Sequence, residues 1–535
     1  MTETPPLEKK TSILPVIARE VTKTAKNILT QTSAHVSTLP ASLKGESRKE
    51  WKNCVSNQIN QPLLVFKPTT LKELRDIITE AGNRKCKVKA IGSGHSFADI
   101  VTTTDFLVET HGLKKELDLE KDLLVDSLNT ENLVNLECGI LIKDLNDLLD
   151  SKALALPNMG GYTGQTIAGV ISTATHGSGI QFGPVADCVL SLTLVTEGGI
   201  TYRIEPTKGI TNPEKFRAAH PDIILKQDDE WFYAAVVSMG CMGIVYSVIL
   251  QVAKKFWLEE IRTISTWDIV KQDLLTGNVL RDNQHYEVLV NPYIVNGKHT
   301  CVVTRRNPID QPDKPDYKRA HRNPLEVFLS TYRFVIFLFN RFLPLIFKYL
   351  PEVTPTLLDN SMKSLKDDSY VAPSYKVFDI GSPNYIGAYS SEIGFPMSTY
   401  IDAVEEMFEL ADKLRVIGRA YSTCPFSLRF VKTSPAFVAM MNGRDTCMIE
   451  MPIVKGTHAG FDILKQYEQA MYKFGGRPHW GQIHFFTGNN GFIKTMYPEL
   501  EKWLRVYRLL CKQGTFQNST TERCGFAEYS FGDVG

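Results

Sequence analysis

Residues 92–96 read Gly-Ser-Gly-His-Ser, and residues 164–179 read GQTIAGVISTATHGSG. Both stretches are rich in glycine, which lacks a β-carbon and lets backbone N–H groups close on a phosphate. The first stretch follows residues 86–91, an apolar run that predicts a strand. Neither stretch contains the Gly-x-Gly-x-x-Gly pattern of a Rossmann unit or the Gly-Lys-Ser/Thr of a P-loop. Each turn therefore indicates a phosphate contact only in combination with further motifs.

The segments around the two turns predict a mixed α and β domain. Residues 63–66 read as a strand, and Thr70 and Glu73 have the capping-box spacing that opens a helix. The same alternation recurs further along the chain, with strands at 133–138, 189–195 and 201–204 and a helix at 141–149.

Composition excludes several classes of protein. The chain has 535 residues, 60 basic and 59 acidic side chains, and a hydrophobic content of 43%, which is typical of a globular protein of about two to four domains. A net charge of +1 argues against a nucleic-acid partner and favours a small-molecule ligand. The ten cysteines are scattered singly, so we expect no metal site, no disulfide framework and an intracellular, reducing location.

Residues 1–50 contain no Phe, Tyr or Trp, and this predicts an appendage with little core of its own. Within it, Leu14, Ile17 and Val21 recur at helical spacing, which indicates an amphipathic helix. Two interpretations stay open, a helix packed on its own domain and a helix that lies on a membrane surface or serves targeting.

Residues 325–350 form the most hydrophobic segment of the chain, yet Arg333, Asn340, Arg341 and Lys348 interrupt it. On a helix these four side chains fall on one side, which predicts an aromatic-rich helix with a cationic stripe. Three interpretations remain: contact with a membrane surface, a surface helix packed on the protein, and a true span with snorkelling cations.

A third motif, found together with the two glycine-rich stretches, makes the sequence pattern specific for one kind of protein. It spans residues 231–252 and includes Ser-Met-Gly-Cys-Met-Gly-Ile-Val at 238–245. With these three motifs in this order, the chain resembles flavoproteins of the vanillyl-alcohol oxidase and p-cresol methylhydroxylase fold. Within that fold it is most similar to the sugar-1,4-lactone branch, which comprises gulonolactone, arabinonolactone and alditol oxidases.

The resemblance implies an α+β fold class and a division of the chain into three parts. Residues 1–50 are the appendage, and residues 51–255 are a two-lobed FAD-binding domain. Residues 256–535 are an α/β substrate (cap) domain that includes the apolar helix and returns to the flavin at its C-terminal end.

The resemblance also implies FAD as the cofactor, joined covalently through His95 to the 8α-methyl carbon of the flavin. The loop around His95 matches the family's flavin turn, and residues 168–179 match the segment that wraps the pyrophosphate and isoalloxazine. Backbone atoms at Ile244 would reach the adenine or ribityl region. The other cofactor-binding residues implied are Gly92, Ser93, Gly94, Ser96, Thr166, Gly169, Ser172, Thr173, Thr175, His176 and Gly177.

Two of these residues have a second interpretation. His176 is expected to pack and hydrogen-bond within its turn rather than act on substrate. Thr166 stands where alditol oxidases place a hydroxyl beside the substrate, and it is a candidate for a hydrogen bond to a sugar hydroxyl.

The substrate half departs from the family pattern at two positions. The family has Glu-x-Arg on a strand and His-Trp-x-Lys near the end of the chain. Here Arg429 and His479 match these motifs, but Ser427 stands at the position of the glutamate and Gln482 at the position of the lysine. Arg429 keeps the family's cation, whereas serine and glutamine can hydrogen-bond but cannot carry the charges of glutamate and lysine.

We take Arg429, Gln482, His479 and Ser427 as the catalytic candidates. Because an acid/base pair is missing or relocated, three further residues of the same half are candidate substitutes: Glu392, Glu450 and His484.

The expected activity is oxidation of the alcohol carbon of an aldono-1,4-lactone or alditol. A hydride passes to flavin N5, and the electrons pass to O2 with formation of H2O2. One alternative is a membrane-associated dehydrogenase of the same substrates or of a sterol. The other, from a different class, is an FAD-binding protein that has lost turnover, which the changes at 427 and 482 suggest. Lactone or alditol, and O2 or a membrane electron acceptor, are the expected partners.

Overall fold

The computed structural model describes residues 39–40, 43–47, 50–276, 278–313, 342–380, 387–488 and 492–527. The predicted helical stripe in the first fifty residues lies outside this part of the chain. So does the first part of the predicted apolar helix, residues 325–341, whereas residues 342–349 are helical. No helix in the described part is both long and apolar enough to cross a membrane.

The first sheet contains the two strands predicted at 63–66 and 86–91. The turn at residues 92–96, called the flavin-type turn below, follows the second of them. The strand order of this sheet is β1–β4–β6–β5, and both β4 and β5 run parallel to β6. The helix α2 (Leu71–Asn83) begins where predicted, because the Thr70 hydroxyl accepts a hydrogen bond from Glu73 N (3.2 Å). The strands of this sheet are β1 (Gly45–Glu46), β4 (Leu64–Phe66), β5 (Val88–Ile91) and β6 (Phe106–Glu109).

The second sheet has the order β12–β11–β10–β13–β8–β7. Its pairs are antiparallel except β11 with β12. The strands are β7 (Glu116–Leu117), β8 (Leu133–Glu137), β10 (Val189–Val195), β11 (Thr201–Glu205), β12 (Ile224–Gln227) and β13 (Ile244–Gln251). The helices of this region are α3 (Ile142–Ser151), α4 (Ile167–Ser172), α5 (Pro213–Ala219) and α6 (Asp229–Ala235).

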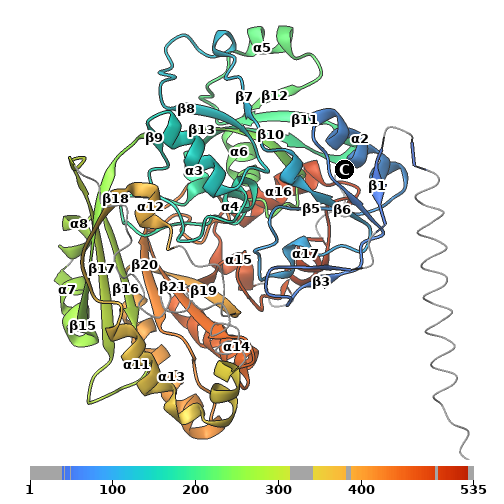
Figure 1. The fold of residues 1–535 in the computed structure, drawn as a ribbon. Coiled ribbons are helices and arrows are strands. Elements are labelled where there is room, and N and C mark those ends of the chain that lie inside the picture. The colour runs from blue at the N-terminus through green and yellow to red at the C-terminus, as the bar shows by residue number, and fades with distance from the viewer. Residues whose placement is uncertain are drawn as a thin grey trace, which may run out of the picture.

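The third sheet is antiparallel throughout, in the order β18–β15–β17–β16–β20–β21–β19–β22. It occupies the lower left of Figure 1, below the first two sheets. Its strands are β15 (Trp257–Thr266), β16 (His285–Val290), β17 (Thr300–Ile309), β18 (Asp367–Pro373), β19 (Ala388–Pro396), β20 (Phe426–Val431), β21 (Thr446–Val454) and β22 (Arg477–Pro478). Its helices are α7 (Trp267–Thr276), α8 (Val279–Asp282), α11 (Thr354–Lys363), α12 (Ser374–Phe378), α13 (Tyr400–Gly418) and α14 (Gly460–Met471). Two small pairs, β2 (Trp51–Lys52) with β3 (Ile59–Asn60) and β9 (Leu154–Ala155) with β14 (Ala253–Lys254), complete the strands.

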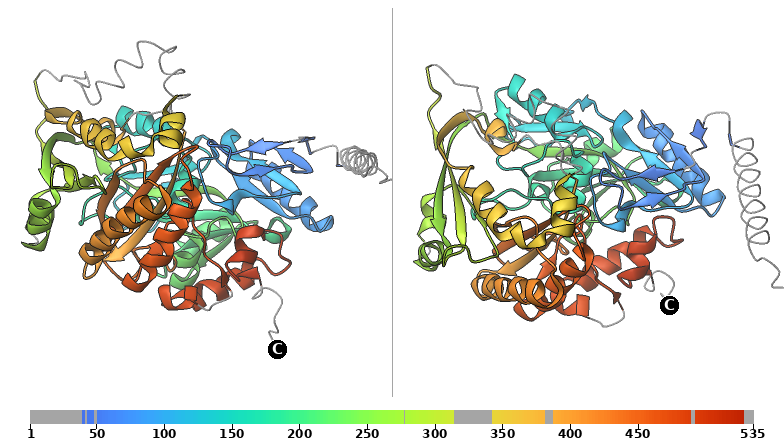
Figure 2. Two further views of the ribbon diagram at one scale, coloured as in Figure 1. Left: turned by 90° about the horizontal axis from the view of Figure 1, so that it is seen from below. Right: turned by 60° about the horizontal axis from the view of Figure 1, so that its bottom comes forward.

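The C-terminal segment returns from the third sheet to the first two. It carries α15 (Phe492–Met496), α16 (Leu500–Leu510) and α17 (Ser519–Arg523). The Trp503 indole N–H donates to Val237 O (3.0 Å), and Val88 N donates to Thr515 O (2.7 Å). Figure 2 shows these red helices against the green segment that includes α6. The C-terminal segment therefore packs against the part of the molecule that contains the first two sheets.

Two large apolar clusters hold the fold together. One joins the first two sheets to the C-terminal helices, and the other fills the space between the third sheet and its helices. Loops that connect the elements of the first two sheets face the third sheet. The cavity described below lies between these loops and the third sheet.

Candidate active site

The turn after β5 brings His95 to a cavity wall. Its Nδ1 lies 2.9 Å from Ser93 Oγ, and its ring packs on Tyr162 with centroids 4.5 Å apart. Burial lowers the pKa of His95, so its imidazole is neutral near pH 7 and carries a free ring nitrogen lone pair.

The second glycine stretch forms the start of α4 and touches the first. Thr166 is the N-cap of α4, and its hydroxyl accepts from Gly169 N (3.3 Å). A β-carbon at Gly92 would lie 2.1 Å from Thr166 Oγ1, a distance that no two such atoms can share. Gly92 is therefore required for the two loops to meet.

These loops and the third sheet enclose a cavity of about 360 Å³. The predicted residues that line it are Gly92, Ser93, Gly94, His95, Ser96, Thr166, Gly169, Ser172, Thr173, Thr175, His176, Ile244, Arg429, His479 and Gln482. Two predicted residues, Gly177 and Ser427, are not among the lining residues. The sequence motifs therefore converge on one site from five separate parts of the chain.

The cavity wall fits a flavin dinucleotide. Gly240 lines it with φ of +65°, and a β-carbon there would meet no protein atom within 4 Å. A side chain at Gly240 would consequently stand in the space of the ligand, and its absence leaves backbone groups exposed to it. The buried Oε1 of Gln482, a residue that lines this space, has no hydrogen-bond partner among the described residues and is an available acceptor.

Arg429 is the cation that the third sheet contributes to the cavity, and two neighbouring strands hold it. Its Nε donates to Glu287 Oε1 on β16 (3.1 Å), and its Nη1 lies 3.5 Å from Glu450 Oε2 on β21. Arg306 also donates to Glu287 (3.1 Å). Burial alone would raise the pKa of Glu287, but the charges of Arg429 and Arg306 outweigh it and lower that pKa to about 2.

Ser427 does not stand in for the family's glutamate in the cavity. Its hydroxyl donates to Glu287 Oε1 (3.2 Å), on the side of Arg429 where Glu287 lies. Glu287 was not singled out from the sequence, because its contact with Arg429 depends on the pairing of β16 with β20. A lone carboxylate within the apolar strand His285–Val290 is the one signal that was present.

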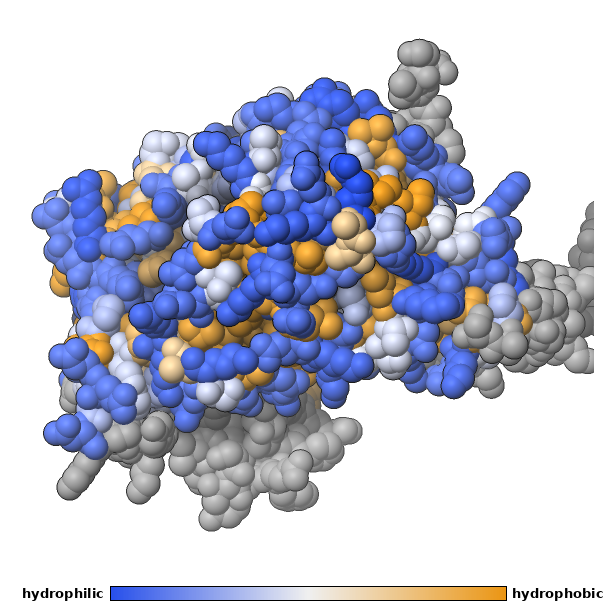
Figure 3. All heavy atoms as spheres, turned by 90° about the horizontal axis from the view of Figure 1, so that it is seen from above, coloured by the Kyte–Doolittle hydropathy of each residue, from blue (hydrophilic) through white to orange (hydrophobic). Residues whose placement is uncertain are grey.

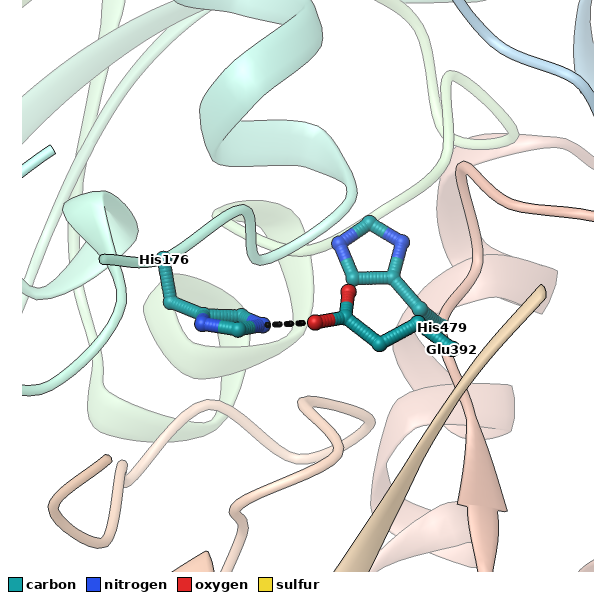
Figure 4. Close-up of side chains that lie close together, drawn as sticks. All are labelled: His176, Glu392 and His479. Atoms are coloured by element: carbon teal, nitrogen blue, oxygen red, sulfur yellow. Dashed lines mark ion pairs between the residues drawn. The ribbon is translucent and has the colours of Figure 1, made fainter. Parts of the chain in front are cut away.

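A second buried group, His176, Glu392 and His479, faces the same cavity (Figure 4). Nε2 of His176 lies 3.4 Å from Glu392 Oε1, and its Nδ1 lies 2.9 Å from Gly177 O. His479 Nδ1 accepts from Gly481 N (3.0 Å).

Electrostatics favour a hydrogen-bonded group over a metal centre at these three residues. Burial would raise the pKa of Glu392, but His176, His479 and Arg429 outweigh it and lower that pKa. Burial lowers the pKa of His479 to about 4. The possible ligand atoms lie within 4.8 Å of one another, which is compatible with a metal ion, but the neighbouring Arg429 charge disfavours a cation here.

Of the three candidate substitutes, Glu392 and Glu450 line the cavity and His484 does not. His484 packs edge-on against Trp480, with ring centroids 5.6 Å apart, and its Nδ1 lies 3.3 Å from Arg523. His484 is thus a core residue behind the site.

Comparison with known proteins shows which family the chain resembles. A family model described as D-arabinono-1,4-lactone oxidase matches residues 248–524, and one described as FAD binding domain matches residues 62–205. The chain is 27% identical to L-gulono-1,4-lactone dehydrogenase of Mycobacterium tuberculosis, over 88% of this chain and 98% of that protein. It is 26% identical to L-gulonolactone oxidase of Mus musculus, over 86% and 95%.

Solved structures show the fold. Cholesterol oxidase from Brevibacterium sterolicum superposes with a TM-score of 0.69 at 12% identity, over 91% of this chain and 98% of that one. A VAO-type flavoprotein of Myceliophthora thermophila gives 0.57 at 12% identity, over 85% and 78%. The predicted α+β fold with an FAD-binding region of the vanillyl-alcohol oxidase type is confirmed.

Proposed function

The chain belongs to the D-arabinono-1,4-lactone oxidase family, and from that premise we propose that it oxidises the alcohol carbon of an aldono-1,4-lactone or an alditol. It is an FAD-dependent oxidoreductase acting on CH–OH donors. The observation that carries the proposal is the placement of Arg429 and two carboxylates in the same cavity as the flavin-type loops.

Alcohol oxidation needs a cation where negative charge develops and an acceptor for the hydroxyl proton. When bound, FAD supplies the acceptor of the hydride at N5 and passes two electrons to oxygen, which gives hydrogen peroxide. Arg429 supplies the cation, and Glu287 keeps its guanidinium ionised and aimed. Gln482 and Thr166, which line the cavity, are the proposed hydrogen-bond partners of the substrate hydroxyls.

The cofactor is proposed to be held covalently through His95. A neutral imidazole is the nucleophile that attack on the flavin methyl carbon requires, and burial keeps His95 in this form. Ser93, Gly94, Ser96 and the loop at α4 would hold the rest of the isoalloxazine and the pyrophosphate.

Oxygen is the proposed electron acceptor, with a membrane acceptor as the second candidate. The relative from Mycobacterium tuberculosis is named a dehydrogenase and the one from Mus musculus an oxidase, so similar proteins carry both names. The likeness to cholesterol oxidase, at 12% identity, supports the fold and lends no weight to a sterol substrate.

On the described surface, the proposed place for membrane contact is the helical segment 342–349, which belongs to the predicted apolar helix, together with its neighbours. The face seen from above in Figure 3 is mostly hydrophilic, with apolar residues in separate groups. An ion pair of Arg419 with Glu352 joins the end of α13 to the segment before α11, and both helices lie at the bottom of Figure 1. Exposed apolar side chains gather there: Phe342, Leu345, Tyr349, Leu350, Val353, Leu357, Val416 and Ile417. We call this set the apolar end.

Steady-state assays test the proposed function. Purified protein loaded with FAD is mixed with a panel of aldono-1,4-lactones and alditols, and oxygen uptake and peroxide are measured together. One-to-one oxygen uptake and peroxide formation with at least one panel member is expected. Turnover only with a quinone or dye acceptor would replace oxygen by the second candidate. Turnover with neither would contradict the substrate class.

A further inference from the structure

Three carboxylates surround the single guanidinium of Arg429. Glu287, Glu450 and Glu392 all act on its charge, and each stands on a different strand of the third sheet. One cation cannot balance three carboxylates, so the excess charge must be relieved by other partners or by a proton.

Two of the three carboxylates have further cationic or imidazole partners. Glu287 accepts from Arg306 as well as Arg429, and Glu392 lies against His176. Glu450 has Arg429 at 3.5 Å and the Ser390 hydroxyl, which donates to its Oε1 at 3.0 Å. Glu450 is therefore the carboxyl group of this set with the least compensation.

Strand register explains how Glu450 comes to face the cavity. Ser427 on β20 and Glu450 on β21 are direct cross-strand partners, so their side chains leave the same face of the sheet. The Ser427 hydroxyl is engaged by Glu287 and stays out of the cavity, whereas Glu450 lines it. The family pattern has a carboxylate at position 427. In this chain Glu450, the direct cross-strand partner of Ser427 on β21, supplies a carboxylate on the same face of the sheet.

We propose that Glu450 is the proton acceptor for the substrate hydroxyl, in place of a carboxylate at position 427. The inference rests on the proposed function. The substrate O–H bond breaks, its proton bonds to a Glu450 oxygen, and the O–H electron pair forms the C=O bond while the C–H hydrogen leaves with its electron pair as a hydride, which bound FAD would accept. Water then takes the proton from Glu450, which restores the carboxylate.

The charges around Glu450 suit this task. The charged or titratable groups that face it are Arg429, Glu392, Glu287 and the Cys424 thiol. Burial raises the pKa of Glu450; Arg429 opposes this rise, and Glu392 and Glu287 add to it. A proton acceptor works best when its pKa is close to the working pH, and the lowered pKa values of Glu392 and His479 make them weaker bases.

Glu450→Gln is the first test, because it keeps the shape and removes the base. We expect FAD content equal to that of the parent chain and anaerobic flavin reduction by substrate slowed about 10²- to 10⁴-fold. The rising limb of the pH–rate profile is expected to vanish. The control is Glu468→Gln, a buried carboxyl outside the cavity, which should leave the rate and the limb in place. Parental rate and profile in Glu450→Gln would overturn the inference.

An exchange of the two residues is the second test. Ser427→Glu alone adds a fourth carboxylate beside Arg429 and is expected to slow the reaction. Combined with Glu450→Ser, it should restore the rate at least tenfold over Glu450→Ser alone. A double variant no faster than Glu450→Ser would contradict the relocation of the carboxylate.

Infrared titration of the apoprotein gives a readout that needs neither FAD nor substrate. The parent chain is expected to show a titrating carboxylic-acid C=O band that is absent in Glu450→Gln, and identical titrations would overturn the inference. If no substrate reduces the flavin of the parent chain, the proposed function fails separately and this titration still decides the state of Glu450.

Discussion

At the scale of the residue, His95 combines three properties that a covalent flavin link needs. It lines the cavity, its ring is oriented by Ser93 and Tyr162, and burial keeps it neutral near pH 7. A neutral ring nitrogen can attack the flavin methyl carbon, whereas an imidazolium cannot.

We therefore expect His95→Ala to lose covalent flavin. On acid precipitation the yellow colour should leave the pellet in His95→Ala and stay with it in the parent chain. The matched control His111→Ala changes an exposed histidine and should behave as the parent chain. Retention of acid-stable flavin in His95→Ala would show that another residue carries the link.

At the scale of the element, the flavin-type turn and α4 form one unit. Thr166 caps α4, and the same hydroxyl occupies the space where a β-carbon of Gly92 would lie. A change at Gly92 must therefore displace either the turn or the helix start, and both bound the cavity.

Gly92→Ala is expected to lower the flavin-to-protein ratio of the purified chain severalfold, because the added methyl overlaps Thr166 Oγ1. The matched control is Gly82→Ala in α2, where a β-carbon meets no atom within 4 Å. That control should keep its flavin and gain about 0.5–1 kcal/mol of stability. Normal flavin content in Gly92→Ala would contradict the close contact.

Helix α14 carries a buried titrating group, Glu468. It accepts from Phe485 N and from the Tyr472 hydroxyl, and burial raises its pKa to about 7. The pKa of Glu468 in the folded chain lies above its unfolded value of about 4.3. Below about pH 4.3, Glu468 therefore makes its full contribution to the free energy of unfolding. The contribution is lost as pH rises through about 7, and it amounts to roughly 4 kcal/mol.

Glu468→Gln should flatten the dependence of stability on pH between about 4.3 and 7. Urea midpoints measured across this range test it, with exposed Glu409→Gln as control. A midpoint that falls as steeply in Glu468→Gln as in the parent chain would contradict the assignment of this titration to Glu468.

At the scale of the whole molecule, α11 and α13, which carry part of the apolar end, lie at the bottom of Figure 1, and the face seen from above in Figure 3 is mostly hydrophilic. This polarity is what an enzyme docked on a membrane surface would have, since exposed apolar side chains enter the interface and polar faces stay in water. Val416 and Ile417 are the most exposed of the set, at 68% and 75%.

Val416→Ser combined with Ile417→Ser is expected to lower binding to anionic lipid vesicles at least about tenfold in a flotation assay. The control pair Ile200→Ser and Ile224→Ser removes exposed apolar side chains from the upper face and should leave binding unchanged. Equal flotation of both pairs, or no flotation of the parent chain, would contradict membrane docking.

How far the sequence predicts the molecule depends on the range of the contacts. The strands and helices beside the glycine-rich turns depend on contacts between residues close in sequence. The spacing of Thr70 and Glu73 alone therefore predicts the start of α2. The setting of Arg429 is not predicted in this way, because Glu287 and Glu450 reach it across strand pairs whose register the whole sheet sets. Ser427 was placed among the catalytic candidates because it stands at the position of the family's glutamate, and the register of the sheet directs its hydroxyl to Glu287, which does not line the cavity.

The central claim is that this chain uses bound FAD to oxidise a sugar lactone or alditol. The most direct test is the absorbance spectrum of the purified protein, recorded anaerobically before and after each member of the substrate panel is added. We predict a flavin spectrum that at least one lactone or alditol bleaches and that air restores. A colourless protein that cannot be loaded with FAD, or a flavin that no lactone or alditol bleaches, would contradict the claim.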